Sequence, residues 1–328
     1  MKKNKTLDII CIALAVVTLL FAGLAIKNVI TGKKESDGIS SEAAAVAFSG
    51  EVETDSLGTK LSSLVANNMK NASYPDGILD SLKAAYAASS NIEGWLTIPG
   101  TEIDTAVMQG SDNSRYLKYD FYERYTTETS SLNYGNIYLD YRCRNDGVLS
   151  KNMVIHGHTT GKSDGIPKQS FRSLYNYQDA EYYKEHPIIK FSTLYGEYTY
   201  KICAVFYSTT QSSADNGYFF NYIYPDMSDS NMTGYIKQVK ERMLYDTGVS
   251  LENTDNIITL STCIYVYGKS VDTRLVVVGR LLHEGEDEAV DTSLVKDNPD
   301  YRRPQVWYSN NGKTNPYKNS EKWQPSAE

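Results

Sequence analysis

Residues 257–282 read IITLSTCIYVYGKSVDTRLVVVGRLL, and the interpretation of the whole chain starts from this stretch. Two apolar, β-branched runs flank Gly268 and Lys269, a pattern typical of an antiparallel hairpin. Cys263 ends the first run and Arg274 begins the second. If the chain turns midway, these two residues lie opposite each other on neighbouring strands. A thiol beside a fixed guanidinium indicates nucleophilic chemistry.

Outward from the hairpin, the chain from Trp95 onward has the pattern of a barrel. Short apolar or alternating runs bounded by turn residues lie at 95–98, 105–108, 136–139, 153–156, 188–192, 197–207, 257–262 and 274–281. Eight such strands can close on themselves and leave no edge exposed. One helix interrupts them, with Asp229 or Ser230 as its N-cap and Gly248 as its stop. Its apolar positions are Ile236, Val239, Met243 and Leu244.

Several segments, in their order along the chain, resemble the sortases, the cell-surface transpeptidases of Gram-positive bacteria. TLSTC at 259–263 and RLVVVGR at 274–280 resemble the active-site hairpin, and NMVIHGH at 152–158 resembles the segment that carries the family's histidine. NIEGWLTIPGT at 91–101, followed by Ile103-Asp104, resembles the opening of the class B branch. The resemblance implies a mainly β (α+β) fold: a closed eight-stranded sortase-type barrel with N-terminal helices and one helix inserted before the cysteine strand.

The resemblance also implies roles for residues. Cys263 would attack a backbone carbonyl of a C-terminal sorting signal and carry the acyl group as a thioester. His158 would protonate the leaving amine, and Arg274 would bind the developing oxyanion or hold the peptide. Nearby cations are expected to lower the pKa of the thiol. Ser261 is expected to contact the substrate backbone, its alternative role being a strand-end hydroxyl bonded to main chain. Ile264 follows the cysteine where some class B members have an acidic residue, so no carboxylate is assigned.

Four cysteines are present, and three of them follow the apolar N-terminal segment. An odd number leaves at least one thiol free unless it pairs with another molecule. Cys203 lies in an alternating strand and is interpreted as a small buried apolar group. Cys143, between Arg142 and Arg144, has the stronger rival claim because two arginines depress a thiol pKa. Cys263 is preferred because it alone combines a strand end, a facing arginine and the family pattern.

The chain has four histidines. His186 and His283 are interpreted as structural or solvated. His156 and His158 are two apart on one strand end, so alternation points both to the same side and does not separate them. The resemblance favours His158. A His-x-His pair also suggests a metal, but no third ligand stands at diagnostic spacing, so neither a metal nor a cofactor is expected.

The N-terminal segment predicts a membrane protein. Residues 9–26 form an uncharged, mostly apolar run that spans roughly 27 Å as a helix, near the minimum for a bilayer. The run is longer than the core of a signal peptide and ends in a poor cleavage site, so a retained anchor is favoured over a cleaved signal. Lysines before the run place the N-terminus in the cytoplasm and the catalytic part outside the cell.

Five regions follow from these patterns: a cytoplasmic tip and anchor (1–31), a flexible stalk (32–59), helices packing on the barrel (60–90), the catalytic barrel (91–283) and an acidic, polar tail (284–328). The tail opens with five acids in eight residues and is predicted to be mostly disordered, with Trp307, Tyr308 and Trp323 available to dock on a neighbour. The net charge is −7, and residues 1–32 carry +3, so the remainder carries −10. No basic patch indicates a nucleic-acid partner.

The sequence therefore predicts a membrane-anchored, class B-like sortase. Its expected partners are secreted proteins with a C-terminal sorting motif, a peptidoglycan precursor amine as acceptor, and the lipid bilayer. Two alternatives stay open: a pilin-polymerising sortase that uses a pilin lysine as acceptor, and a non-catalytic surface-binding module on the same barrel. A papain-like hydrolase is disfavoured because its cysteine precedes its histidine, whereas His158 here precedes Cys263.

Overall fold

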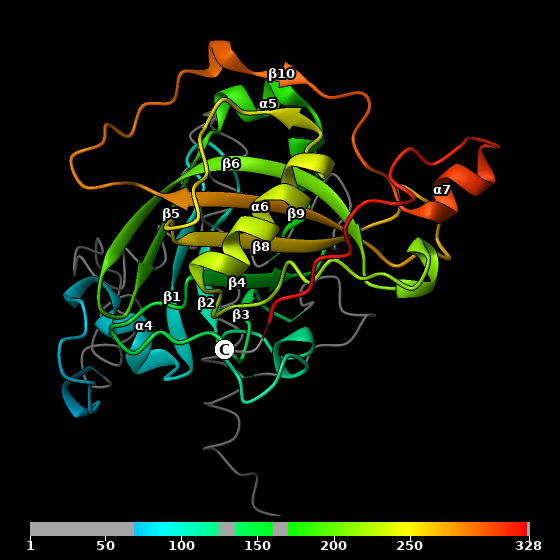
Figure 1. The fold of residues 1–328 in the computed structure, drawn as a ribbon. Coiled ribbons are helices and arrows are strands. Elements are labelled where there is room, and N and C mark those ends of the chain that lie inside the picture. Colours follow the sequence, from blue (N-terminus) through cyan, green and yellow to red (C-terminus); the bar gives the residue numbers. More distant parts are fainter. Residues whose placement is uncertain (1–68, 124, 126–134, 160–169, 327–328) are drawn as a thin grey trace, which may run out of the picture.

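The computed structural model describes residues 69–123, 125, 135–159 and 170–326 (Figure 1). Within them, a closed barrel has the strand order β1-β2-β3-β4-β8-β9-β6-β5. The strands are β1 (Ile92–Thr97), β2 (Asp104–Met108), β3 (Tyr138–Leu139), β4 (Asn152–Gly157), β5 (Ile188–Thr193), β6 (Glu197–Thr209), β8 (Ile257–Ile264) and β9 (Thr273–Leu281). All eight predicted strands are confirmed, and so is their closure.

Strand β8 has β4 on one side and β9 on the other. β8 and β9 pair antiparallel, with Cys263 opposite Arg274. Gly268 lies in the connecting turn at φ 98°, a conformation that glycine adopts without strain. On the other side, β4 runs parallel to β8 and sets Gly157 opposite Thr262. His158, which follows Gly157, and Cys263, which follows Thr262, therefore lie at the same end of these two strands. This agrees with the predicted roles of the hairpin and the histidine segment.

Alternation along the strands gives the barrel an interior and an outer face. The interior core includes Ile258, Leu260, Leu275 and Val277. The outer face of the same strands presents Ile257, Val276 and Val278 to helix α6 (Asp229–Arg242). Cys263 is two residues from Ser261, and Arg274 is two residues from Val276, so both continue the outward-facing rows. The site thus lies on the outer face of the barrel and not in its interior.

Helix α6 packs across the outer face through Met232, Tyr235 and Val239. It begins earlier than its apolar pattern predicts. Ser228, and neither of the two predicted residues, is the N-cap, because its hydroxyl accepts a hydrogen bond from the Asn231 amide at 3.2 Å. The helix also ends at Arg242, before the predicted glycine stop. There Met243 bridges to strand β6 and the chain enters β7 (Tyr245–Asp246).

Within the region 60–90, where helices were predicted, the structure has η1 (Asp80–Leu82) and α4 (Lys83–Ala88), and Leu82 and the preceding Ile78 are buried in a cluster with residues of β1 and β2. The predicted anchor and stalk lie outside the described residues, as do residues 60–68 of the predicted helical region. Within the described ranges, no helix has the length and hydropathy needed to cross a bilayer.

Several short elements were not predicted. They are η2 (Arg115–Leu117), η3 (Arg172–Gln178), α5 (Ala180–Glu185), η4 (Ser212–Asp215), η5 (Thr292–Leu294), β10 (Lys296–Asp297) and α7 (Gln305–Asn310). Of these, η2 and η3 contribute contacts to the site described below. Elements of this length show too few turns for an apolar period to be read from sequence.

The prediction of a mostly disordered tail is wrong for residues 284–326. Strand β10 pairs with β7, and Trp323 is buried against α6. The first acids of the tail have specific partners: Glu286 forms ion pairs with Arg280 at 2.5 Å and with Lys201 at 2.8 Å. Both cations are nearly buried, so this carboxylate neutralises charge that the barrel would otherwise hold unpaired.

We expect Glu286→Gln to lower the free energy of unfolding by about 2 kcal/mol at pH 7, because it leaves two buried cations without a counter-charge. The hydrogen bond from Arg280 holds the pKa of Glu286 far below its usual value of 4.5. The stabilisation is therefore fully present above about pH 4.5 and is lost as the pH falls toward the folded-state pKa.

Urea denaturation of the full-length protein measures this effect. Glu288→Gln is the matched control, because Glu288 pairs with Lys190 while both side chains are about half exposed, and we expect less than about 1 kcal/mol from it. Equal effects of the two substitutions at pH 7 would contradict the assignment, as would a Glu286→Gln effect that is no smaller at pH 3 than at pH 7.

Candidate active site

The Cys263 thiol and the Arg274 guanidinium lie together where β8 ends and β9 begins. Cys263 is partly buried, and the Arg274 side chain is 23% exposed. A carboxylate from the preceding turn holds the guanidinium. Both terminal nitrogens of Arg274 contact Asp272, and Nη1 also donates to the Thr273 carbonyl at 3.2 Å. The predicted pair of thiol and guanidinium is present, with an acidic partner that sequence reasoning missed.

Burial raises the pKa of the Cys263 thiol above its usual value of 9.0. Arg274 acts in the opposite direction, but Asp272 cancels part of that effect. The expected lowering by a neighbouring cation is present, because Arg274 acts in that direction, but burial outweighs it and the pKa of the thiol is raised. A raised pKa favours the thiol over the thiolate, and attack of a thiol on a carbonyl requires a base.

The structure distinguishes between the two histidines. His158 follows the last residue of β4 and lies at the end of the barrel that holds Cys263. Its Nε2 lies 3.0 Å from the Leu117 carbonyl oxygen at the end of η2, and this contact is exposed. Among the described residues, no hydrogen bond joins the His158 ring to Cys263. The imidazole thus lies at the same end of the barrel as the Cys263 thiol and contacts the Leu117 carbonyl oxygen.

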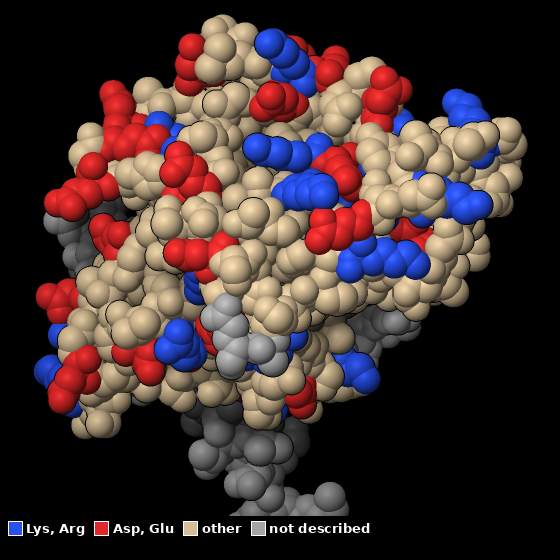
Figure 2. All heavy atoms as spheres, in the orientation of Figure 1, with Lys and Arg blue, Asp and Glu red and all other residues tan. Residues whose placement is uncertain are grey.

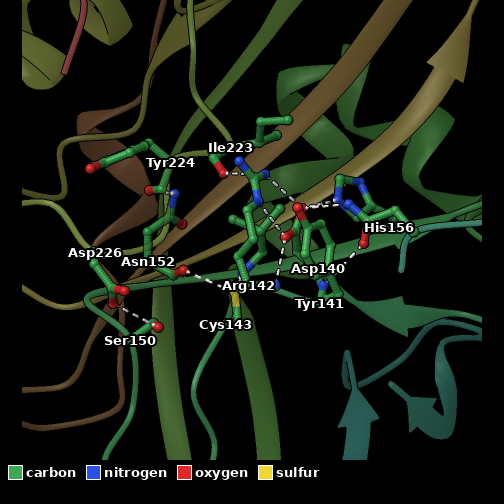
Figure 3. Close-up of polar contacts among 12 residues, drawn as sticks. Asp140, Tyr141, Arg142, Cys143, Ser150, Asn152, His156, Ile223, Tyr224 and Asp226 are labelled. Atoms are coloured by element: carbon green, nitrogen blue, oxygen red, sulfur yellow. Dashed lines mark hydrogen bonds and ion pairs between the residues drawn. The ribbon is translucent and has the colours of Figure 1, made fainter. Parts of the chain in front are cut away.

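His156 is instead part of a buried network around Asp140 (Figure 3). Its Nε2 lies 3.1 Å from Asp140 Oδ2, and its ring packs on Tyr138 at 5.3 Å between centroids. Arg142 donates two hydrogen bonds of 2.8 Å to the same carboxylate. Although burial raises the pKa of Asp140, the hydrogen bonds from Arg142 and His156 hold it well below its usual range. His156 is therefore held by a structural contact with Asp140.

The backbone of the candidate nucleophile is held by two hydroxyl groups. The Cys263 carbonyl accepts a hydrogen bond from Thr159 Oγ1 and another from the Tyr175 hydroxyl, both at 2.9 Å. Thr159 is the residue after His158, so its bond ties the histidine segment to the cysteine strand. Tyr175 comes from η3, which sequence patterns did not reveal.

Comparison with known proteins agrees with this geometry. A family model described as Sortase domain matches residues 96–282, more than half of the chain. The chain belongs to the sortase family. Sortases are cysteine transpeptidases associated with the surface of Gram-positive bacteria, and the chain is therefore an enzyme of this class.

Two relatives, both named sortase B, indicate the branch of the family to which the chain belongs. Sortase B of Listeria monocytogenes is 31% identical over 207 residues, covering 62% of this chain and 75% of the relative. Sortase B of Staphylococcus aureus is 28% identical over 195 residues, covering 59% and 71%. Among solved structures, a Staphylococcus aureus sortase B–substrate complex matches with a TM-score of 0.52 and 25% identity, over 68% of this chain and 94% of that one. A Bacillus anthracis protein similar to sortase B gives 0.52 and 26%, over 70% and 98%. The predicted class B-like branch is confirmed.

Ser261, predicted to contact substrate, is buried in this sortase. Its hydroxyl lies 2.9 Å from the hydroxyl of Tyr222, which precedes α6. The backbone around Tyr222 is itself held, because Asn152 Nδ2 donates to the carbonyls of Tyr222 at 3.0 Å and Tyr224 at 3.1 Å. Ser261 thus joins the cysteine strand to the segment before α6, and its contact with substrate remains a prediction.

The other two described cysteines are packing residues. Burial raises the pKa of both Cys143 and Cys203 to about 12, and the Cys143 sulfur is hydrogen-bonded to the amide of Val154 at 3.4 Å. His186 contacts the Pro99 carbonyl, and His283 contacts a carboxylate. Within the described part of the chain, no group of three or more His, Cys, Asp or Glu side chains is arranged to hold a metal ion.

Asp272→Asn is expected to lower the pKa of Cys263, because it removes the carboxylate that raises the pKa and frees the Arg274 charge. We expect iodoacetamide to alkylate Cys263 on the order of threefold faster at pH 8, since a partly exposed charge contributes less than about 1 kcal/mol. Mass spectrometry of the Cys263 peptide measures the rate. Asp287→Asn, in the tail, is the control and leaves the rate unchanged; a slower or unchanged rate in Asp272→Asn contradicts the prediction.

Tyr175→Phe and Thr159→Val each remove one hydroxyl from the Cys263 carbonyl. We expect either substitution to lower kcat/KM for a sorting peptide about fivefold to tenfold, since one such hydrogen bond is worth about 1 kcal/mol. Tyr177→Phe is the matched control, because its hydroxyl, also on η3, bonds to the His186 carbonyl at 2.7 Å. If all three variants lose activity equally, the prediction that the Thr159 and Tyr175 hydroxyls position Cys263 is wrong.

Proposed function

We propose that this sortase is held in the membrane by residues 9–26 and acts outside the cell on secreted proteins. It cleaves their C-terminal sorting signal through a thioester on Cys263 and passes the acyl group to a cell-wall precursor amine. The pairing of Cys263 with Arg274 on β8 and β9, with His158 at the end of the adjacent β4, is the observation that carries this proposal. The sortase B–substrate complex among the similar structures supports the substrate class.

The first half-reaction follows from these three residues. As the Cys263 sulfur attacks the scissile carbonyl, the imidazole of His158 takes the thiol proton, because the raised pKa leaves the resting sulfur protonated. Arg274 binds the oxyanion that forms on the carbonyl oxygen. The carbon–nitrogen bond then breaks, and the His158 imidazolium returns its proton to the leaving amine. The product is a thioester on Cys263.

The second half-reaction reverses these roles. An incoming amine attacks the thioester carbonyl, Arg274 again binds the oxyanion, and His158 takes a proton from the attacking nitrogen. The carbon–sulfur bond breaks, the sulfur recovers that proton, and the acyl group is left in a new amide bond. Water competes with the amine for the thioester, so the enzyme depends on positioning one acceptor.

The proposal is tested by incubating the full-length protein with a sorting-peptide library, with and without a wall-precursor amine, and by mass spectrometry of the products. We expect Cys263→Ala to abolish the acyl adduct and His158→Ala nearly to abolish it. Arg274→Ala is expected to slow turnover about 100-fold, the effect of losing one oxyanion donor. Arg274→Lys is expected to recover little of this loss, because an ammonium does not reproduce a planar fork.

Cys143→Ala is the matched control and is expected to keep full turnover. The opposite result, in which Cys143→Ala stops turnover and Cys263→Ala spares it, would overturn the assignment. A pilin lysine offered in a parallel reaction distinguishes the pilin-polymerising alternative by the preferred acceptor. A binding module would form no adduct on Cys263 with any peptide.

A further inference from the structure

The last described segment, residues 321–326, lies along α6 and runs in the opposite direction (Figure 1). Near the end of the helix, Gln238 Nε2 donates to the Glu321 carbonyl at 3.1 Å and Lys237 pairs with the Glu321 carboxylate at 2.9 Å. Near its start, Asn231 exchanges two hydrogen bonds with the backbone of Ser326, of 3.0 and 2.9 Å. Acidic and basic side chains are interspersed on the face shared by α6 and the tail (Figure 2).

Trp323 is the centre of this contact. Its side chain is 6% exposed and packs on Phe220 at 5.8 Å and on Tyr235 at 6.1 Å between ring centroids. The indole lies directly on the backbone of α6 at Gly234, where an added Cβ would come within 2.1 Å of its Cδ1 atom. A glycine in mid-helix costs stability, so its presence here agrees with a required close approach.

Between the tail and the barrel lies the segment before α6, residues 216–224. On the outer side, Lys322 Nζ donates to the Asn216 carbonyl at 2.8 Å and Gln324 Nε2 donates to the Phe219 carbonyl at 3.1 Å. The Tyr218 hydroxyl also donates to the Trp323 carbonyl at 3.0 Å. The tail therefore holds this segment at three successive places.

On the inner side, the same segment contacts the site. The Tyr222 hydroxyl bonds to Ser261, two residues before Cys263 on the same face of β8. Arg142, which also binds Asp140, donates to the Ile223 carbonyl at 3.0 Å (Figure 3). Phe220 connects the two sides, because its ring packs on Trp323 and lies 6.2 Å from the ring of Tyr222.

We propose that the C-terminal tail positions Tyr222 and Ile223, which form one side of the site where the sorting peptide binds in this sortase. Trp323, acting through Phe220, is a positioning residue for Tyr222 and Ile223, and Gly234 is the site that admits its indole. The tail lies beyond residues 96–282, so the proposed device is outside the part of the chain that matches the family model. The inference rests on the proposed function in one respect, namely that Tyr222 and Ile223, beside Ser261, face the sorting peptide.

The test uses Trp323→Ala and Gly234→Ala in the full-length chain, with Trp307→Ala as the control, since Trp307 is a tail tryptophan that packs elsewhere. We expect KM for the sorting peptide to rise about tenfold in the first two variants, with KM for the acceptor amine unchanged. Because both act on one contact, the double variant is expected to be no worse than the more impaired single variant. Trp307→Ala keeps both KM values.

Hydrogen exchange gives a second reading that does not depend on turnover. Amides of residues 219–224 are expected to exchange at least tenfold faster in the two variants, while those of β8 are unchanged. Gln324→Ala, which removes only the bond to Phe219, gives a smaller increase in the same peptide and serves if Trp323→Ala does not fold. Unchanged exchange at 219–224 in the folded variants, or a fall in kcat with KM unchanged, overturns the inference.

The two proposals fail in different ways. If the wild-type chain forms no acyl adduct while exchange at residues 219–224 still responds to Trp323→Ala, the proposed function is wrong and the positioning contact stands. If the wild-type chain is active and the variants match it in both KM and exchange, the positioning contact is wrong and the proposed function stands.

Discussion

The register between β8 and its two neighbours is the constraint on which the rest of the structure depends. Backbone hydrogen bonds set Cys263 opposite Arg274 on one side and bring the end of β4, with His158 beyond it, alongside on the other. A shift of one residue would turn the thiol into the barrel interior, since successive side chains face opposite ways. Core packing of residues such as Leu260 and Val277 makes that shift costly, so the hydrophobic interior holds the polar site in place.

Charge around the candidate nucleophile is closely balanced. Asp272 binds the guanidinium of Arg274, and burial, more than Asp272, raises the pKa of the Cys263 thiol against the lowering effect of Arg274. Another carboxylate, the buried Asp140, is paired with Arg142 and contacts His156. Each of these two charged centres thus has a counter-charge within the structure: Asp272 for Arg274, and Arg142 for Asp140.

Sequence patterns predicted the barrel well, because each strand carries its own period of alternation and the hairpin of Cys263 and Arg274 is local. They failed where partners are distant. Glu286 looked like part of a solvated acidic run, yet its partner Lys201 lies far back in the chain. Tyr175 gave no signal of its bond to the Cys263 carbonyl, since η3 is too short to show a period. Trp323 was predicted to be available for docking, but the sequence did not indicate where, because its receiving surface on α6 exists only after folding.

The protonated state of Cys263 also bears on the lifetime of the enzyme. Peroxides and disulfides react with a thiolate far faster than with a thiol, so a sulfur kept neutral at rest is a poor target for them. An enzyme working beyond the reducing cytoplasm has no glutathione pool to repair its nucleophile. Burial, which raises the pKa of Cys263, and Asp272, which offsets part of the lowering by Arg274, both act in the direction of slower oxidation of this sulfur.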